Sequence, residues 1–126
     1  MAYIPFNNNP NGNYVGDCSI RAIAKALGKT WEDAYIALCA EGLMYHDMPS
    51  SPYVIGMYLK KQGYERKIIP NICPDCTTLR AFTEDHKTGT FIIVTDGHIV
   101  TAIDGDYYDI WDSGDEIVLY YYMEEM

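Results

Sequence analysis

The residue best suited to nucleophilic chemistry is Cys18, which stands where helical periodicity begins. Apolar residues recur at helical spacing from Ile20 to Leu27, and this predicts a helix over residues 18–27 with Asp17 as its N-cap. Unpaired N–H groups and aligned peptide dipoles at a helix start favour an anion, so they lower the pKa of a thiol placed there. Cys18 is therefore a candidate nucleophile; the alternative is a small residue buried at a helix start.

His98 is the candidate general base, because a nucleophilic thiol needs a group that accepts its proton. It follows the turn Asp96-Gly97 and opens a predicted strand. The base in turn needs a partner that fixes its tautomer and orientation. The hairpin that begins at His98 is the place to look for this partner.

The partner of His98 depends on the register of that hairpin. A three-residue loop at residues 104–106 pairs residues whose numbers sum to 210, and it places Asp112 directly opposite His98. A two-residue loop at Asp104-Gly105 sets His98 opposite Trp111 and turns Asp112 to the other face. The three-residue register gathers aliphatic side chains on one face, so Asp112 is the predicted partner. The other acidic residues of the hairpin remain alternatives: Asp104, Asp106 and Asp109.

This set of residues resembles that of papain-like cysteine peptidases, most closely the small C39-like members of bacteria and phages. Gly-Asp-Cys-Ser around Cys18, the late His98 and Trp-Asp-Ser-Gly around Asp112 carry the likeness, which extends over nearly the whole chain. It implies a nucleophile at the start of the first long helix, and a histidine and an Asn or Asp on neighbouring antiparallel strands. It also implies hydrolysis of a peptide or isopeptide amide through an acyl-enzyme, with Cys18, His98 and Asp112 as a triad.

The same family places a Gln, or sometimes an Asn, a few residues before the nucleophile to hold the oxyanion. This chain has no Gln there; Asn13 is the nearest counterpart and Asn11 the second. Asn13 is thus the fourth predicted catalytic residue, with an ordinary turn residue as its alternative. The missing Gln also supports a second hypothesis, an inactive papain-like binding module such as a host-interaction protein of a phage or mobile element.

The elements that position these residues follow the order helices first, strands second. Further helical patterns begin at Thr30, at Ser51-Pro52 and at Thr77 or Thr78, and Arg66–Ile69 predicts a short strand. After Gly89 the chain turns to β-branched and aromatic runs: Phe91–Thr95, His98–Ile103, Tyr107–Trp111 and Ile117–Tyr122. We therefore expect an α+β fold of papain-like type, with N-terminal helices packed on a C-terminal antiparallel meander and an irregular arm over residues 1–16.

Length and charge narrow the classes of function. The 126 residues predict a single domain over residues 1–126, and a net charge of −9 argues against a nucleic-acid or anionic membrane surface. No signal-peptide pattern or membrane-spanning run is present, so a cytoplasmic location is expected. The expected partner is a peptide or protein substrate, neutral or basic because acidic residues from Asp104 to Asp115 would flank the site. No cofactor is predicted, and the oligomeric state is left open.

The remaining thiols have separate interpretations. Cys39 falls within the second predicted helix and is expected in the core. Cys73 and Cys76 form a CxxC pair, which is half of a tetrahedral zinc site; His46, His86 and Cys39 are the residues available to complete it, without the usual paired spacing. A structural turn is the favoured interpretation, and a zinc-stabilised interaction domain is the third functional hypothesis.

Overall fold

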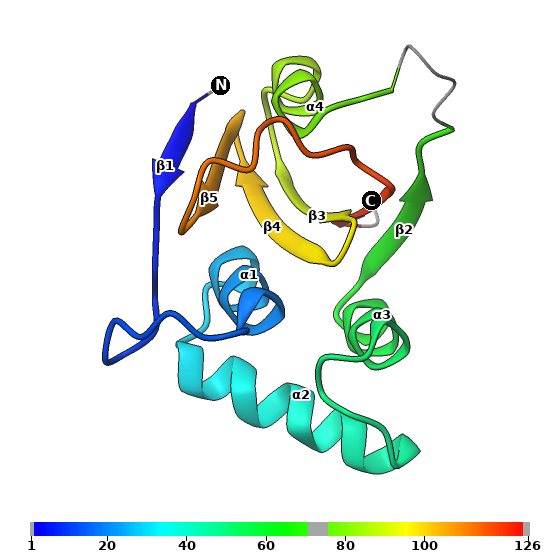
Figure 1. Cartoon of the computed structure of the whole chain (residues 1–126). Helices are drawn as coiled ribbons and strands as arrows, with labels where there is room; N and C mark the ends of the chain where they lie inside the picture. Colours follow the sequence, from blue (N-terminus) through cyan, green and yellow to red (C-terminus); the bar gives the residue numbers. More distant parts are fainter. Residues whose placement is uncertain (1, 71–75, 125–126) are drawn as a thin grey trace.

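A computed structural model shows how these segments pack, and it describes residues 2–70 and 76–124 (Figure 1). The chain has an α+β fold, as predicted, with most helices before most strands. Its elements in chain order are β1 (Tyr3–Pro5), α1 (Cys18–Leu27), α2 (Trp31–Tyr45), α3 (Pro52–Lys61), β2 (Tyr64–Ile68), α4 (Leu79–Asp85), β3 (Thr90–Thr95), β4 (His98–Ile103), β5 (Asp106–Asp109) and β6 (Tyr120–Glu124). None of the helices among the described residues is long and apolar enough to cross a membrane.

The strands of the described chain form one mixed sheet in the order β1-β5-β4-β3-β6-β2. β3, β4 and β5 are consecutive antiparallel neighbours, as the predicted meander requires. β6 departs from that prediction, because the chain crosses back after β5 and pairs β6 with β3 and β2. The N-terminal arm also differs from the prediction: β1 lies parallel to β5, and three residues are too few to show a periodicity in the sequence.

The helices cover the sheet from both sides (Figure 1). Side chains alternate between the two faces of a strand, so neighbouring residues of β3 and β4 belong to different layers of the core. Ile92 and Ile99 pack with α1, α2 and α3 in one buried cluster. Ile93 and Val100 pack with Leu79 and other residues around α4 in a second cluster. The first layer positions Cys18, because α1 lies directly against β4.

The β4–β5 hairpin has a two-residue loop, so the three-residue register predicted from the sequence is wrong. Thr101 pairs with Tyr108 and Ile103 with Asp106, which makes partner numbers sum to 209. Asp104 and Gly105 both have positive φ angles, of 51° and 87°. This is the backbone of a type I′ turn, for which Asp-Gly is a favoured sequence because its twist matches that of the flanking strands. The one-residue difference changes which acidic residue reaches His98.

Candidate active site

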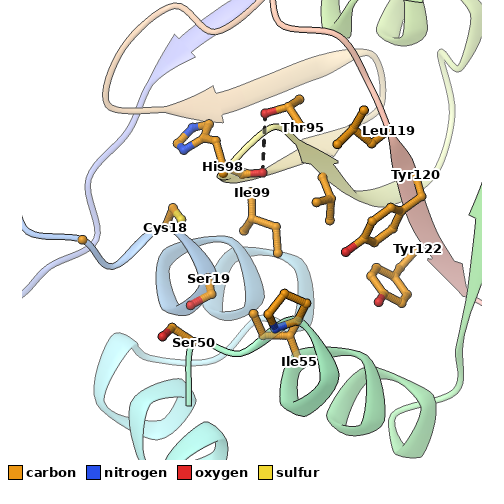
Figure 2. Close-up of a pocket in the computed structure, with 14 residues that line it drawn as sticks. Cys18, Ser19, Ser50, Ile55, Thr95, His98, Ile99, Leu119, Tyr120 and Tyr122 are labelled. Atoms are coloured by element: carbon orange, nitrogen blue, oxygen red, sulfur yellow. Dashed lines mark hydrogen bonds between the residues drawn. The ribbon is translucent and has the colours of Figure 1, made fainter. Parts of the chain in front are cut away.

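Cys18 is the first residue of α1, and its partly buried thiol points toward the strand that carries His98 (Figure 2). Burial raises the pKa of this thiol. Hydrogen bonds with the His98 ring and the Ile99 backbone N–H, together with the positive charges of His98 and Arg21, outweigh burial and bring the pKa below its ordinary value. The thiol is therefore poised toward the thiolate, the nucleophilic form of cysteine.

His98 is the first residue of β4, and its ring is bonded on both sides. Its Nε2 lies 2.6 Å from Oδ2 of Asp109, which leaves Nδ1 as the nitrogen available to Cys18. Burial lowers the pKa of the ring, but the hydrogen bonds to Asp109 and Cys18 raise it to about 9. The indole of Trp111 packs against the imidazole, with 5.2 Å between ring centroids. The ring is thus held in place and kept protonated at neutral pH.

Asp109 is the carboxylate behind His98, at the end of β5. It is fully buried, and burial raises its pKa, yet the hydrogen bonds that it accepts from His98, Ser113 and the Ile110 N–H lower the pKa overall. The Ser113 hydroxyl donates to Oδ2 at 2.6 Å, and the Ile110 N–H donates to Oδ1 at 2.8 Å. Asp109 is therefore an ionised side chain with its orientation fixed from several directions.

Arg21 connects this carboxylate to the helix that bears the nucleophile. Its guanidinium lies 2.6 Å from Asp17 and 3.3 Å from Oδ1 of Asp109, and all three side chains are almost fully buried. The other oxygen of Asp17 accepts a hydrogen bond of 2.9 Å from the Trp31 indole. Asp17 thus occupies the N-cap position of α1 without capping it by its side chain. The first-turn N–H groups beside Cys18 are left without that cap.

Asp112, the predicted partner of His98, lies elsewhere and does not bond to it. Its carboxylate accepts hydrogen bonds from the Tyr107 hydroxyl and, at 3.0 Å, from the Gly114 N–H, and it lies 3.5 Å from Arg80. It stabilises the turn after β5. The prediction that Asp112 orients His98 is therefore wrong.

The hairpin register explains why Asp109 takes that place. Continuing the observed pairing sets Trp111 opposite His98 and Asp109 opposite Val100, so Asp109 is the diagonal neighbour of His98 on the same face. The contact between the His98 and Trp111 rings agrees with this pairing. Asp109 was among the alternatives that the sequence left open, and the Asp-Gly turn signal was the feature that pointed to it.

Asn13, the predicted oxyanion donor, lies in the exposed arm and does not line the cavity at Cys18. Its backbone N–H donates to Asn9 at 3.3 Å, and its carbonyl accepts from Asn7 at 3.1 Å. The N–H of Asn11, the second candidate, also donates to Asn9, at 3.0 Å. The asparagines therefore fold the arm upon itself, and neither predicted amide is placed beside the thiol.

The Cys18 and His98 side chains open into a cavity of about 380 Å³. Its walls are mainly apolar and come from α3, β3, β4 and the segment leading into β6. Figure 2 shows Tyr120 and Tyr122 projecting into it on the side away from Cys18. No acidic residue is among its lining residues in the described chain, so the expected acidic flank is not found. The carboxylates of the hairpin bond elsewhere, Asp104 to Gly89, Asp106 to Ala2 and Asp115 to Arg80.

The other thiols lie apart from this cavity. Cys39 is partly buried on α2. Cys73 lies outside the described residues, so its pairing with Cys76 around a metal stays a prediction. Over residues 2–70 and 76–124, no group of three or more His, Cys, Asp or Glu side chains is arranged to hold a metal ion. His86, one of the residues considered for such a site, stacks on Phe82 with 3.9 Å between ring centroids.

Comparisons with known proteins found no relative of this chain. No protein-family model, no curated protein and no solved structure matches it. The geometry of the site is therefore the basis for assigning a function.

Proposed function

We propose that the chain is a papain-like cysteine hydrolase that cleaves a peptide or isopeptide amide through an acyl-enzyme on Cys18. The observation that carries the proposal is that His98 sits between the Cys18 thiol and the buried Asp109, at a cavity large enough to admit a side chain. A nucleophile, a base and a carboxylate that orients the base form the constellation that acyl transfer requires. The α+β fold, with the nucleophile opening the first helix, is compatible with this type of enzyme.

In the first half-reaction, the Cys18 thiolate forms a bond to the amide carbonyl carbon, and the C=O electron pair moves onto the oxygen. The first-turn N–H groups of α1, which the Asp17 side chain does not cap, are available as donors to this oxyanion. His98 then gives its Nδ1 proton to the amide nitrogen. The C–N bond breaks, the amine leaves, and a thioester on Cys18 remains.

In the second half-reaction, neutral His98 takes a proton from a water molecule, whose oxygen attacks the thioester carbonyl carbon. The C–S bond breaks, the carboxylic acid product leaves, and Cys18 and His98 return to the thiolate–imidazolium pair. Asp109 does not exchange a proton in either step. It holds the ring in the orientation that Nδ1 needs and stabilises the imidazolium.

Labelling followed by turnover tests this proposal. The chain is treated with iodoacetamide at neutral pH, the modified cysteine is mapped by mass spectrometry, and hydrolysis is screened on a fluorogenic peptide library. We expect Cys18 to react at least tenfold faster than glutathione, and both labelling and hydrolysis to be lost in His98→Ala. Cys39→Ala is the matched control and should change neither. Labelling of Cys18 no faster than glutathione would overturn the proposal.

An inactive binding module is the second candidate, and the placement of Asn13 favours it. A cavity without a side-chain amide lacks one donor that the resembled family supplies, and loss of one oxyanion donor costs about 10²–10³ in rate. The same two measurements separate the candidates. Fast labelling of Cys18 without hydrolysis of any library peptide supports the binding module, whereas hydrolysis that depends on Cys18 supports the enzyme.

A further inference from the structure

A second cavity adjoins the one at Cys18. It has a volume of about 500 Å³, is lined by residues of α3, β2 and β6, and shares the wall residues Pro52 and Tyr122 with the first. Tyr122 is 5% exposed, and its hydroxyl approaches α3 so closely that a Cβ at Gly56 would lie 3.0 Å from it. The two cavities therefore lie side by side with the Tyr122 ring in the wall between them, and together they are called the groove below.

The second cavity carries lysine and arginine side chains, which the wall of the first lacks. Lys60 and Arg66 line it, and both are exposed to solvent. Among the described residues that line it, the acidic side chain of Glu65 lies 3.3 Å from Lys67, which offsets its charge. A local excess of positive charge in a chain of net charge −9 is a feature that recognises anions.

Arg66 also links the two cavities. Its guanidinium lies 4.4 Å from the ring centroid of Tyr120, a residue of the first cavity's wall. Stacking on an aromatic ring restrains the guanidinium while its N–H groups remain able to donate to a carboxylate. The Tyr120 and Tyr122 rings pack edge to face at 5.9 Å, so the cation is held at the junction of the cavities.

We infer that this groove binds a peptide that carries a carboxylate next to an apolar residue, with the apolar residue in the cavity at Cys18 and the carboxylate at Lys60 and Arg66. An Asp or Glu side chain and a peptide C-terminus offer the same chemistry. The inference rests on the proposed function in taking the first cavity as the place of cleavage, whereas the binding itself requires no catalysis. It differs from the neutral or basic substrate expected from the sequence, because the acidic hairpin does not line the groove.

Calorimetric titration of the Cys18→Ala variant tests the inference without turnover. The probes are acetyl-Leu-Ala-Glu-Ala-amide, its Gln counterpart, and the Gln peptide with a free C-terminal carboxylate, each also in reversed residue order. We expect at least one carboxylate peptide to bind about tenfold tighter than its neutral counterpart at low salt, and the advantage to shrink as salt is added. The Glu and free-terminus peptides distinguish the two sources of the carboxylate.

Charge-removing variants locate the effect. In the Cys18→Ala background, Lys60→Gln with Arg66→Gln should abolish the preference, whereas Lys29→Gln, which removes an exposed charge elsewhere, should preserve it. Equal binding of charged and neutral peptides, a preference that survives the double change, or no binding of any peptide in the millimolar range would each overturn the inference. A chain that binds the acidic peptide but hydrolyses nothing would instead refute only the proposed hydrolase activity.

Discussion

Replacing Asp109 with Asn removes the charge behind His98 and keeps the shape of the side chain. The carboxylate is fully buried and accepts hydrogen bonds from His98, Ser113 and the Ile110 N–H. With an amide in its place, the protonated ring loses the partner that offsets the cost of burying its charge. We expect the pKa of His98 to fall and the pKa of the Cys18 thiol to rise, since each group stabilises the charge of the other.

The size of the effect follows from the pKa of His98. Burial opposes the ring's charge, but the hydrogen bonds to Asp109 and Cys18 raise its pKa from 6.5 to about 9. At about 1.4 kcal/mol per tenfold change in proton affinity, this stabilises the protonated ring by about 3 kcal/mol. The stabilisation is complete below the unfolded pKa of 6.5 and is lost as pH rises through about 9. Asp109→Asn should therefore weaken this pH dependence of stability, because only the contribution of Cys18 remains, and slow Cys18 alkylation at neutral pH about tenfold or more.

The assay measures the rate of Cys18 alkylation by iodoacetamide from acid to alkaline pH, with the modified residue mapped by mass spectrometry. In the unsubstituted chain, Cys18 should react with iodoacetamide at pH values well below those at which an ordinary thiol ionises. In Asp109→Asn, it should react only as the pH approaches those values. Asp112→Asn is the matched control, since it makes the same chemical change at a carboxylate bonded to Tyr107 rather than to His98. Superimposable profiles for the unmodified chain and Asp109→Asn would refute the role of Asp109.

Two further predictions concern stability and are measured by urea unfolding. Arg21→Met should lower the free energy of unfolding by about 3–5 kcal/mol, because it leaves the buried Asp17 without its cation and Asp109 with His98 alone; a loss below about 1 kcal/mol would contradict the pairing of Arg21 with the two carboxylates. Gly42→Ala should cost about 1–3 kcal/mol, because its Cβ would lie 2.6 Å from the backbone oxygen of Asp47. Gly16→Ala, with open space around it, is the control and should change stability by less than about 0.5 kcal/mol.

The sequence predicted the elements whose local signals are strong. Helix α1 occupies Cys18–Leu27 as expected, because its periodic apolar face is followed by Gly28 in the left-handed conformation. The Ser51-Pro52 start and the Thr78 cap also mark α3 and α4. These signals depend on residues within one or two turns of each other, so they can be read without knowing the tertiary structure.

The parts that depend on pairing between distant segments could not be predicted in the same way. The length of the β4–β5 loop, two residues or three, decides which acidic side chain reaches His98. Gathering the aliphatic side chains on one face favours the three-residue loop, whereas the Asp-Gly sequence favours the two-residue loop that forms. β1 is too short to show a period, and its pairing with β5 spans most of the chain. Only its distance from Cys18 along the chain points to Asn13 as an oxyanion donor, whereas hydrogen bonds with the other asparagines of the arm determine where it lies.

The buried ion pairs of Arg21 align the helix that carries Cys18 with the sheet that carries His98. Cys18 belongs to a helix and His98 to the sheet, and an apolar interface alone would tolerate small shifts of one against the other. Arg21 bonds to Asp17, the N-cap residue of its own helix, and across the layers to Asp109. The Thr101 hydroxyl of β4 donates to the backbone of α1. Buried ion pairs contribute little net stability compared with apolar packing, so the main effect of these pairs is to fix the relative position of α1 and the sheet. A guanidinium that must meet both carboxylates fixes where α1 sits on the sheet, and with it the approach of the thiol to the imidazole.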